Sequence, residues 1–408
     1  MSKKGRVYFL FFAIIILAGC SLATIDQAVS RKRQGATNGV EAGCEREHRG
    51  SRRYCREGVT VVILKGSPWE LGYARGTLLR EEIQAWAKES LSEIEQLRTG
   101  RNVGEERLKE NVAKLEAGIP AEFRRELEGL AAASGVDYST LLLLNVWSNV
   151  DAGCASVAVT GHDGKLIRSR NYDWAPIRLL VPPIVFIYQP DNGYVFMSVH
   201  APGLIGVATA MNVHGITLGS HALPGGRHDG KGMPSAMLNR FAVQYARSLD
   251  EMERILGETP RGIPRLWLVT SQDTARIYEF DSFSLYRIDA QDGRLVLTNH
   301  GRYLNFRDPS PSSLERYDFL SRSIAGHVSM DVYRLIELNR DQILYSSQGQ
   351  DLGFTNLHSV VFVPGTLDFW VALGPPPATR GRWIGFSLSK ELSGEGFCPD
   401  PAFFEAMY

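Results

Sequence analysis

The sequence lacks a charge imbalance, a metal-binding cluster and any long apolar run after its first residues. Lys plus Arg and Asp plus Glu number 45 each among 408 residues, so no broad positive charge indicates a nucleic-acid partner. No histidine pair spaced i, i+4 and no cysteine cluster indicates zinc. No strand-to-helix glycine fingerprint indicates a nucleotide. The sequence therefore predicts no metal and no cofactor, while its 44% apolar and 22% charged composition predicts a folded globular protein.

The N-terminus is typical of a bacterial lipoprotein. Three basic residues precede an apolar run at 7–17, which is shorter than the roughly 20 residues that span a bilayer and fits a signal peptide. The run ends in Leu-Ala-Gly-Cys, which resembles a lipobox with Cys20 as the lipidated residue. We expect residues 1–19 to be a lipoprotein signal peptide and the protein to be anchored in the cell envelope, at the outer membrane, or to be periplasmic or secreted. An ordinary signal peptide or an uncleaved anchor is the alternative.

Cysteine is scarce, with five in the chain. Export places the protein in an oxidising compartment, where disulfides persist. Cys44 and Cys55 lie close together in a polar stretch, but with Cys398 also present the pairing stays open. The polar and basic residues 20–58 predict a tether. Cys154, in the middle of the chain, is left without an obvious partner.

The pattern of apolar residues changes at Cys154. Before it, a strand at 59–64 is followed by a helix start at Ser67-Pro68-Trp69-Glu70, with the signature of a capping box and a helix predicted to continue to Trp86. Residues 59–153 are otherwise mainly helical. Residues 154–408 read as blocks of short strands separated by blocks of helices. Such blocks predict an α+β fold in layers rather than alternating βαβ units.

Charged residues are expected beside the Cys154 thiol. Gly153-Cys154 opens a strand, and the Asp163-Gly164 turn predicts a hairpin whose second strand brings Arg170 and Asp173 alongside. An arginine favours the thiolate. A carboxylate opposes the thiolate unless it holds a neighbouring ammonium group, and a free α-amino group on Cys154 would be such a group.

These residues resemble the N-terminal-nucleophile (Ntn) hydrolases. The pattern is similar to the acyl-coenzyme A:6-aminopenicillanate acyltransferase-like family, and more distantly to bile salt hydrolase and penicillin V acylase. In those families the nucleophilic cysteine is followed sixteen residues later by Arg and three residues further by Asp, within an RN-x-D signature. Cys154, Arg170 and Asp173 match that spacing. The resemblance implies that Trp174, next in the chain, is a substrate-contact candidate.

Three further segments carry the resemblance. A Thr-Asn-His segment implies that Asn299 helps form the oxyanion hole, and an SS-x-x-R segment implies that Arg316 lies near the active site. The strand-turn-strand pattern at 211–216 leads to a second oxyanion candidate at Ser220 or His221, where the relatives have Asn or Tyr. The Gly-Ser-Pro-Trp-Glu sequence at 66–70, where the first helix is predicted to start, looks like the opening of the acyltransferase-like proteins.

The resemblance implies a four-layer αββα Ntn-hydrolase sandwich with a helical N-terminal pre-segment, and a self-cleaving enzyme. The Cys154 thiol would attack the Gly153 carbonyl, leaving residues 59–153 as an α chain and 154–408 as the catalytic β chain. The new α-amine, with an ordinary pKa near 8, would then act as general base for the thiol. We expect hydrolysis of a linear amide, or acyl transfer from it, through a thioester at Cys154. The expected partner is a small-molecule amide, with the oligomeric state left open.

Other readings of the same residues remain. Cys154 could be a structural thiol, Arg170 and Asp173 an ion pair at a strand end, Asn299 a turn residue and Arg316 a solvated charge. The alternative function is a non-catalytic lipoprotein of the same fold that binds a small ligand in the cell envelope. That alternative predicts an intact chain.

Overall fold

The computed structural model describes residues 44–100, 104–146, 153–161, 163–174, 182–304, 306–325, 330–345 and 355–394. The predicted signal peptide, the lipidation site at Cys20 and Cys398 lie outside these residues. Within the described ranges no helix combines the length and the apolar character that crossing a bilayer requires.

Two β-sheets form the centre of the described chain. Their strand orders are β1-β2-β3-β6-β7-β8-β9-β10-β11-β12 and β13-β4-β5-β14-β15-β16. All neighbours are antiparallel except β3 and β6, which are parallel. The ten-stranded sheet contains β1 (Arg46–His48), β2 (Ser51–Arg56), β3 (Val59–Gly66), β6 (Ile184–Pro190), β7 (Phe196–His200), β8 (Thr209–Asn212), β9 (Thr217–Ala222), β10 (Arg265–Thr270), β11 (Ala275–Phe280) and β12 (Leu285–Asp289). The six-stranded sheet contains β4 (Gly153–Thr160), β5 (Leu166–Trp174), β13 (Arg294–Leu297), β14 (Thr355–Val363), β15 (Asp368–Leu373) and β16 (Trp383–Ser387).

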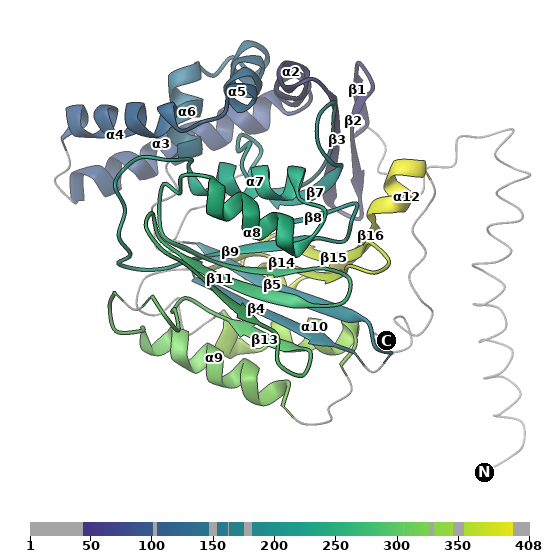
Figure 1. Cartoon of the computed structure of the whole chain (residues 1–408). Helices are drawn as coiled ribbons and strands as arrows, with labels where there is room; N and C mark the ends of the chain where they lie inside the picture. The colour runs from purple at the N-terminus through teal and green to yellow at the C-terminus, as the bar shows by residue number, and fades with distance from the viewer. Residues whose placement is uncertain are drawn as a thin grey trace, which may run out of the picture.

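Helices cover the outer face of each sheet (Figure 1). Those over the ten-stranded sheet are α2 (Pro68–Leu78), α3 (Arg80–Gly100), α4 (Glu105–Ala117), α5 (Ala121–Ser134), α6 (Tyr138–Val146), α7 (Ser235–Tyr245) and α8 (Leu249–Glu258). Those on the six-stranded sheet are α9 (Pro311–Ser323) and α10 (Val332–Asn339), and α12 (Leu388–Ser393) follows β16. Separate apolar clusters fill the helix–sheet, sheet–sheet and sheet–helix spaces. The predicted α+β class and the αββα layering are confirmed.

Strand β3 shows how the sequence builds these layers. Its apolar run is continuous because both faces of the strand are buried. Successive side chains point to opposite faces of a sheet. Val61 and Ile63 therefore pack between the two sheets, while Val62 and Leu64 pack under the helices.

The predicted capping box at the start of α2 is confirmed. Glu70 Oε2 accepts a hydrogen bond from the Ser67 backbone amide at 2.9 Å, and Pro68 occupies the first turn. The single helix predicted to reach Trp86 is instead two helices, because α2 ends at Leu78 and α3 begins at Arg80.

The tether prediction is wrong for residues 44–58, which form strands β1 and β2 at the edge of the ten-stranded sheet. Arg49 and Gly50 both have positive φ, as do Glu57 and Gly58, so each two-residue turn has the backbone twist that suits a hairpin. The polar side chains of β1 are largely exposed, whereas Arg53 and Arg56 on β2 are mostly buried in ion pairs with Glu82 and Glu391. A disulfide between Cys44 and Cys55 joins this segment, which is the bridge the sequence left open.

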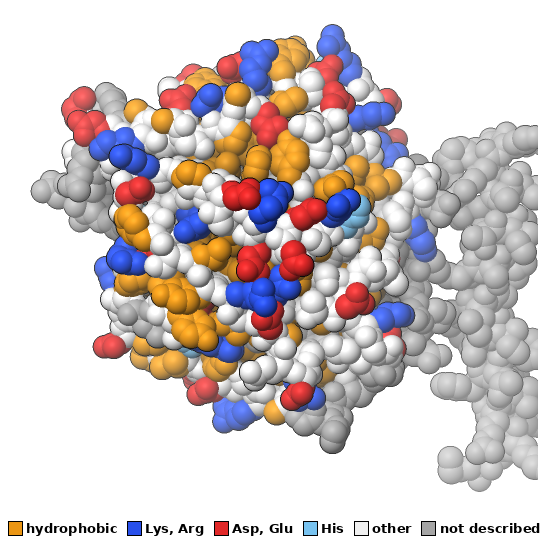
Figure 2. Space-filling model, viewed as in Figure 1, with side chains coloured by type: hydrophobic (Ala, Val, Ile, Leu, Met, Phe, Trp, Pro, Cys, Tyr) orange, Lys and Arg blue, Asp and Glu red, His pale blue; other side chains and the backbone are white. Residues whose placement is uncertain are grey.

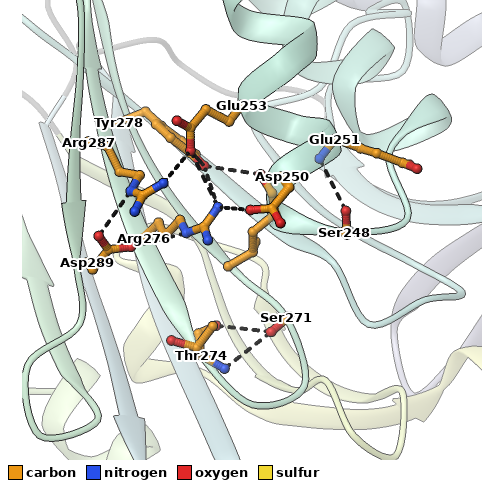
Figure 3. A network of polar contacts seen from close by, with 11 residues as sticks. Ser248, Asp250, Glu251, Glu253, Ser271, Thr274, Arg276, Tyr278, Arg287 and Asp289 are labelled. Carbon is orange, nitrogen blue, oxygen red and sulfur yellow. Dashed lines mark hydrogen bonds and ion pairs between the residues drawn. The ribbon is translucent and has the colours of Figure 1, made fainter.

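A surface ion network ties α8 to the far edge of the same sheet (Figure 3). Arg276 on β11 contacts Asp250 at 2.7 Å and Glu253 at 3.4 Å on α8, and Asp289 on β12 at 3.2 Å. On the face carrying α7 and α8, acidic and basic side chains are intermixed (Figure 2). Since the acidic partners are solvated, each pair contributes little, at about 0–1 kcal/mol.

Candidate active site

Cys154 is the second residue of β4, and its side chain faces the space between the sheets. Ala155 and Val157 pack toward α9 and α10, so the alternation of a strand turns Cys154 and Ser156 toward the other sheet. The thiol is fully buried and lies 4.0 Å from the carbonyl oxygen of Ser220 on β9. The nucleophile candidate is therefore held on a rigid strand.

Arg170 reaches the thiol from the neighbouring strand. The predicted hairpin pairs Cys154 with Tyr172 and Ser156 with Arg170. Arg170 Nη2 lies 3.4 Å from Cys154 Sγ and donates to the Ser220 carbonyl oxygen at 2.5 Å. The carbonyl and the thiol therefore share one guanidinium group.

Asn299 and Arg316 hold the backbone of Cys154. The Cys154 amide donates to Asn299 Oδ1 at 2.7 Å, and Asn299 Nδ2 donates to the Ala222 carbonyl oxygen at 3.2 Å. Arg316, buried on α9, donates through Nη1 to the Cys154 carbonyl oxygen and through Nη2 to Asn299 Oδ1 at 3.2 Å. These bonds fix both the amide that self-cleavage would release and the carbonyl beside it.

Asp173 lies buried at the end of β5, in register with Gly153. Asn356 Nδ2, on β14, donates to its Oδ1 at 2.9 Å. Burial lowers the pKa of Arg316 to about 10, and the charge of Asp173 opposes that shift. Asp173 therefore balances the buried arginine charge as well as acting on Cys154.

Burial and charge act in opposite directions on the thiol. Burial raises the pKa of Cys154, Arg170 lowers it, Asp173 raises it and Arg316 lowers it, and the net direction is upward. At neutral pH the buried thiol is therefore mainly protonated and needs a base to become a nucleophile.

Neutral substitutions of Arg170 and Asp173 should move the pKa of the Cys154 thiol in opposite directions. Arg170→Met removes a cation that stabilises the thiolate, so the pH midpoint of Cys154 alkylation should rise. Asp173→Asn removes an opposing anion, so the midpoint should fall. Iodoacetamide labelling from pH 6 to 10, read at the Cys154 peptide by mass spectrometry, measures both.

Lys165→Met, at the exposed hairpin turn, is the control and should leave the midpoint unchanged. A shift in the same direction for both site variants would contradict the electrostatic assignment. Far-UV circular dichroism would show whether each variant keeps its fold.

A cavity of about 170 Å³ opens onto Cys154. Trp174 and Tyr172 line it and stack on each other, with ring centroids 5.8 Å apart. Most of the lining is apolar and comes from both sides of Cys154 in the sequence. The described members are Trp86, Ser90, Glu93, Ile94, Leu144, Asn145, Cys154, Tyr172, Trp174, Pro183, Val199, His200, Ala201, Leu204, Gly206, Val207, Ala208, Ser220, Ala222, Ser235, Ala236, Asn239, Arg265, Leu357 and His358.

The structure separates the two candidates for a second oxyanion donor. Ser220 lines the cavity, but its amide donates to the Ala208 carbonyl oxygen and its carbonyl accepts from Arg170, so its hydroxyl is the group left to face a substrate. His221 does not line the cavity. Its Nε2 contacts Ser156 Oγ at 2.8 Å and its Nδ1 contacts the Thr298 carbonyl oxygen at 3.1 Å. It thus positions the strand beside Asn299 rather than a substrate.

Two residues that hydrogen-bond to site residues were not predicted from the sequence. Ser313 Oγ accepts from the Asn299 amide at 2.9 Å; it belongs to the SS-x-x-R segment, where only the arginine had a predicted role. Asn356, which holds Asp173, comes from a strand far along the chain and carried no local signal. Among the described residues no group of three or more His, Cys, Asp or Glu could hold a metal ion.

Sequence comparison finds relatives that cover parts of the chain. An uncharacterized protein of Archaeoglobus fulgidus is 31% identical over 264 residues, covering 55% of this chain and 43% of its own length. Acid ceramidase of Macaca fascicularis is 23% identical over 282 residues, covering 57% of this chain and 71% of its own. The chain spans about half the length of several of these relatives, including protein dcd1B of Dictyostelium discoideum, of which it covers 46%.

Solved structures show a limited likeness. An N-acylethanolamine-hydrolyzing acid amidase ortholog of Caenorhabditis elegans is 16% identical with a TM-score of 0.43, covering 52% of this chain and 93% of that chain. Penicillin V acylase of Agrobacterium tumefaciens is 12% identical with a TM-score of 0.42, covering 58% and 87%.

The family model described as acyl-coenzyme A:6-aminopenicillanic acid acyl-transferase matches residues 159–378. The match begins just after Cys154 and includes Arg170, Asp173, Asn299 and Arg316. It takes in more than half of the 408 residues and confirms the family that the motifs indicated. The chain therefore belongs to the acyl-coenzyme A:6-aminopenicillanic acid acyl-transferase family.

Proposed function

We propose that the protein is a self-processing cysteine amidohydrolase or acyltransferase that acts on a linear amide through a thioester at Cys154. One observation carries this proposal: the Cys154 thiol lies in the wall of a mainly apolar cavity, with Arg170 at 3.4 Å and its own amide nitrogen held at 2.7 Å by Asn299. Family membership and the named amidases among the relatives favour an enzyme over the alternative of a ligand-binding lipoprotein.

Self-processing would begin with attack of Cys154 Sγ on the Gly153 carbonyl carbon. The amide nitrogen leaves and takes a proton, which gives a Gly153 thioester and a free α-amine on Cys154. Water then hydrolyses the thioester to a Gly153 carboxylate and the thiol. The arginine that holds the Cys154 carbonyl would keep the strand in place after the cut.

In the mature protein the α-amine would take the thiol proton as sulfur attacks the substrate carbonyl. This supplies the base that a buried, mainly protonated thiol needs. Asn299, whose side chain already contacts the Cys154 amide, would orient the amine or donate to the oxyanion. The amine half of the substrate leaves with the proton, and water or a second amine releases the acyl group.

The self-processing test is made on purified wild-type protein. A denaturing gel should show two fragments, and mass analysis should place Cys154 at the start of the larger one. Two fragments that turn over an amide support the proposal. An intact wild-type chain without amidase activity would contradict the proposal and favour the alternative function, a non-catalytic lipoprotein that binds a small ligand.

We also propose that the protein is anchored in the cell envelope through a lipid on Cys20, as the lipobox resemblance suggests. In a Gram-negative host that expresses the chain, wild type should then sediment with membranes and incorporate labelled palmitate. Cys20→Ala should lose most of both signals, since a stable anchor needs the acyl chains. Equal labelling of the two proteins would contradict the anchor.

A further inference from the structure

Charge is rare in the wall of the catalytic cavity. Among the described residues that line it, Glu93 and Arg265 are the acidic and the basic ones. The two histidines there, His200 and His358, are kept neutral because burial lowers the pKa of each well below its ordinary value. The side chains of Glu93 and Arg265 are therefore the main electrostatic influence on which substrate groups the cavity binds.

Arg265 lies at the nucleophile end of the cavity. It is the first residue of β10 and pairs with Ala222 on β9, whose carbonyl oxygen accepts from Asn299 Nδ2. Its charge also acts on Tyr172, the strand partner of Cys154. The residue is half-buried and lines the cavity, and its Nη1 donates a hydrogen bond to the Pro264 carbonyl oxygen at 3.1 Å.

Glu93 belongs to a different wall. It lies on α3 among apolar lining residues of the pre-segment, including Trp86, Ile94 and Leu144. Burial raises the pKa of Glu93 to about 7, and the neighbouring Glu89 adds to that shift. This wall suits an apolar chain, and a second carboxylate there would meet both desolvation and like-charge repulsion.

We propose that Arg265 is a specificity-determining residue that binds a carboxylate on the amine half of the substrate. The substrates are then N-acyl amino acids with an apolar acyl chain. This inference rests on the proposed amidase function. The acyl chain would pack against the apolar wall of the pre-segment. The amine half, on the other side of the scissile bond, would then lie against the wall that contains Arg265.

The chemistry of arginine supports a carboxylate. Its planar guanidinium donates two parallel hydrogen bonds to one carboxylate, and such charge-assisted bonds are about twice as strong as neutral ones. A neutral amine half would not pair with the cation on entering the cavity. We therefore expect kcat/KM to be roughly 10- to 100-fold higher for a substrate with a carboxylate on its amine half than for one with a neutral amine half.

Three substrates that differ in whether and where they carry a carboxylate test this proposal. N-dodecanoylglycine carries it on the amine half, N-dodecanoylethanolamine carries none, and the N-ethyl monoamide of dodecanedioic acid carries it on the acyl half. The processed wild-type enzyme should prefer the glycine conjugate. Arg265→Gln should reduce that preference to near one, mainly through KM, and Arg265→Lys should restore part of it. Added salt should weaken the preference, since screening acts on the ion pair.

Arg254→Gln is the control, because its pair with Glu258 on α8 is exposed; it should match wild type on all three substrates. A wild-type enzyme that hydrolyses the ethanolamide or the dodecanedioic monoamide at least as well as the glycine conjugate would overturn the assignment of Arg265 while leaving the amidase intact. An unchanged preference in Arg265→Gln would do the same. A cleaved enzyme that hydrolyses none of the three would count against the proposed function and this inference together.

Discussion

Cys154→Ala should give a single uncut chain without amidase activity. The variant loses the atom that would attack the Gly153 carbonyl and the substrate carbonyl, so both reactions stop together. Removing the nucleophile from an enzyme of this kind costs on the order of 10⁴- to 10⁶-fold in kcat. The fold should persist, because the change removes one sulfur from a cavity wall. Gel analysis, intact mass and an N-acyl amide assay measure the two losses.

Cys154→Ser weakens the nucleophile without removing it, and so tests both self-cleavage and amide turnover. A hydroxyl is a weaker nucleophile than a thiol at the same position, so cleavage should be slow and turnover low. Thr160→Ser, at the exposed end of the same strand, is the matched control and should cut and turn over like wild type. Wild-type turnover by Cys154→Ala would rule out the nucleophile assignment.

Glu126→Gln should destabilise the protein by about 3–5 kcal/mol, because it leaves two buried arginines without their anion. Glu126 on α5 is fully buried, 2.6 Å from Arg240 on α7 and 3.9 Å from Arg75 on α2. Burial lowers the pKa of Arg75 to about 9, and Glu126 opposes the shift. The aromatic rings of Phe186, Tyr188 and Phe123 surround the two guanidinium groups.

Urea unfolding of the uncut Cys154→Ala background measures this loss free of cleavage. Glu128→Gln is the matched control on the same helix, since its ion pair with Arg125 is exposed and contributes at most about 1 kcal/mol. Equal effects of the two substitutions would show that the buried anion is not what stabilises the cluster. In cut protein, Glu126→Gln should also weaken the association of the fragments, because Arg75 and Glu126 precede the cut and Arg240 follows it.

Local signals in the sequence gave correct predictions where neighbouring residues decide the structure. The capping of α2 depends on Ser67 and Glu70, three residues apart. The hairpin that brings Arg170 to Cys154 depends on one short turn. The motif around Asn299 indicated a residue whose side chain does contact Cys154, by accepting from its amide.

The missed features depend on distant pairings or on exposed edges. Strands β1 and β2 are rich in polar residues, so their composition resembled a tether, but Arg53 and Arg56 on β2 form ion pairs with the distant Glu82 and Glu391. Asn356 and Arg265 reach the site only through the pairing of β14 with β5 and of β10 with β9. His221 was predicted near a substrate because of its place in the chain, but its ring turns toward Ser156. No short window of sequence contains these pairings.

The place of β3 within the ten-stranded sheet has a consequence for refolding. It lies between β2 and β6, and the chain from β1 to α6 precedes the proposed cut. Once cut, a sheet that assembled within one chain would run through two, so refolding becomes a second-order reaction that slows on dilution. A cut molecule that unfolds in a dilute medium would rarely reassemble. Its working lifetime would then be set by how fast it unfolds, not by its equilibrium free energy.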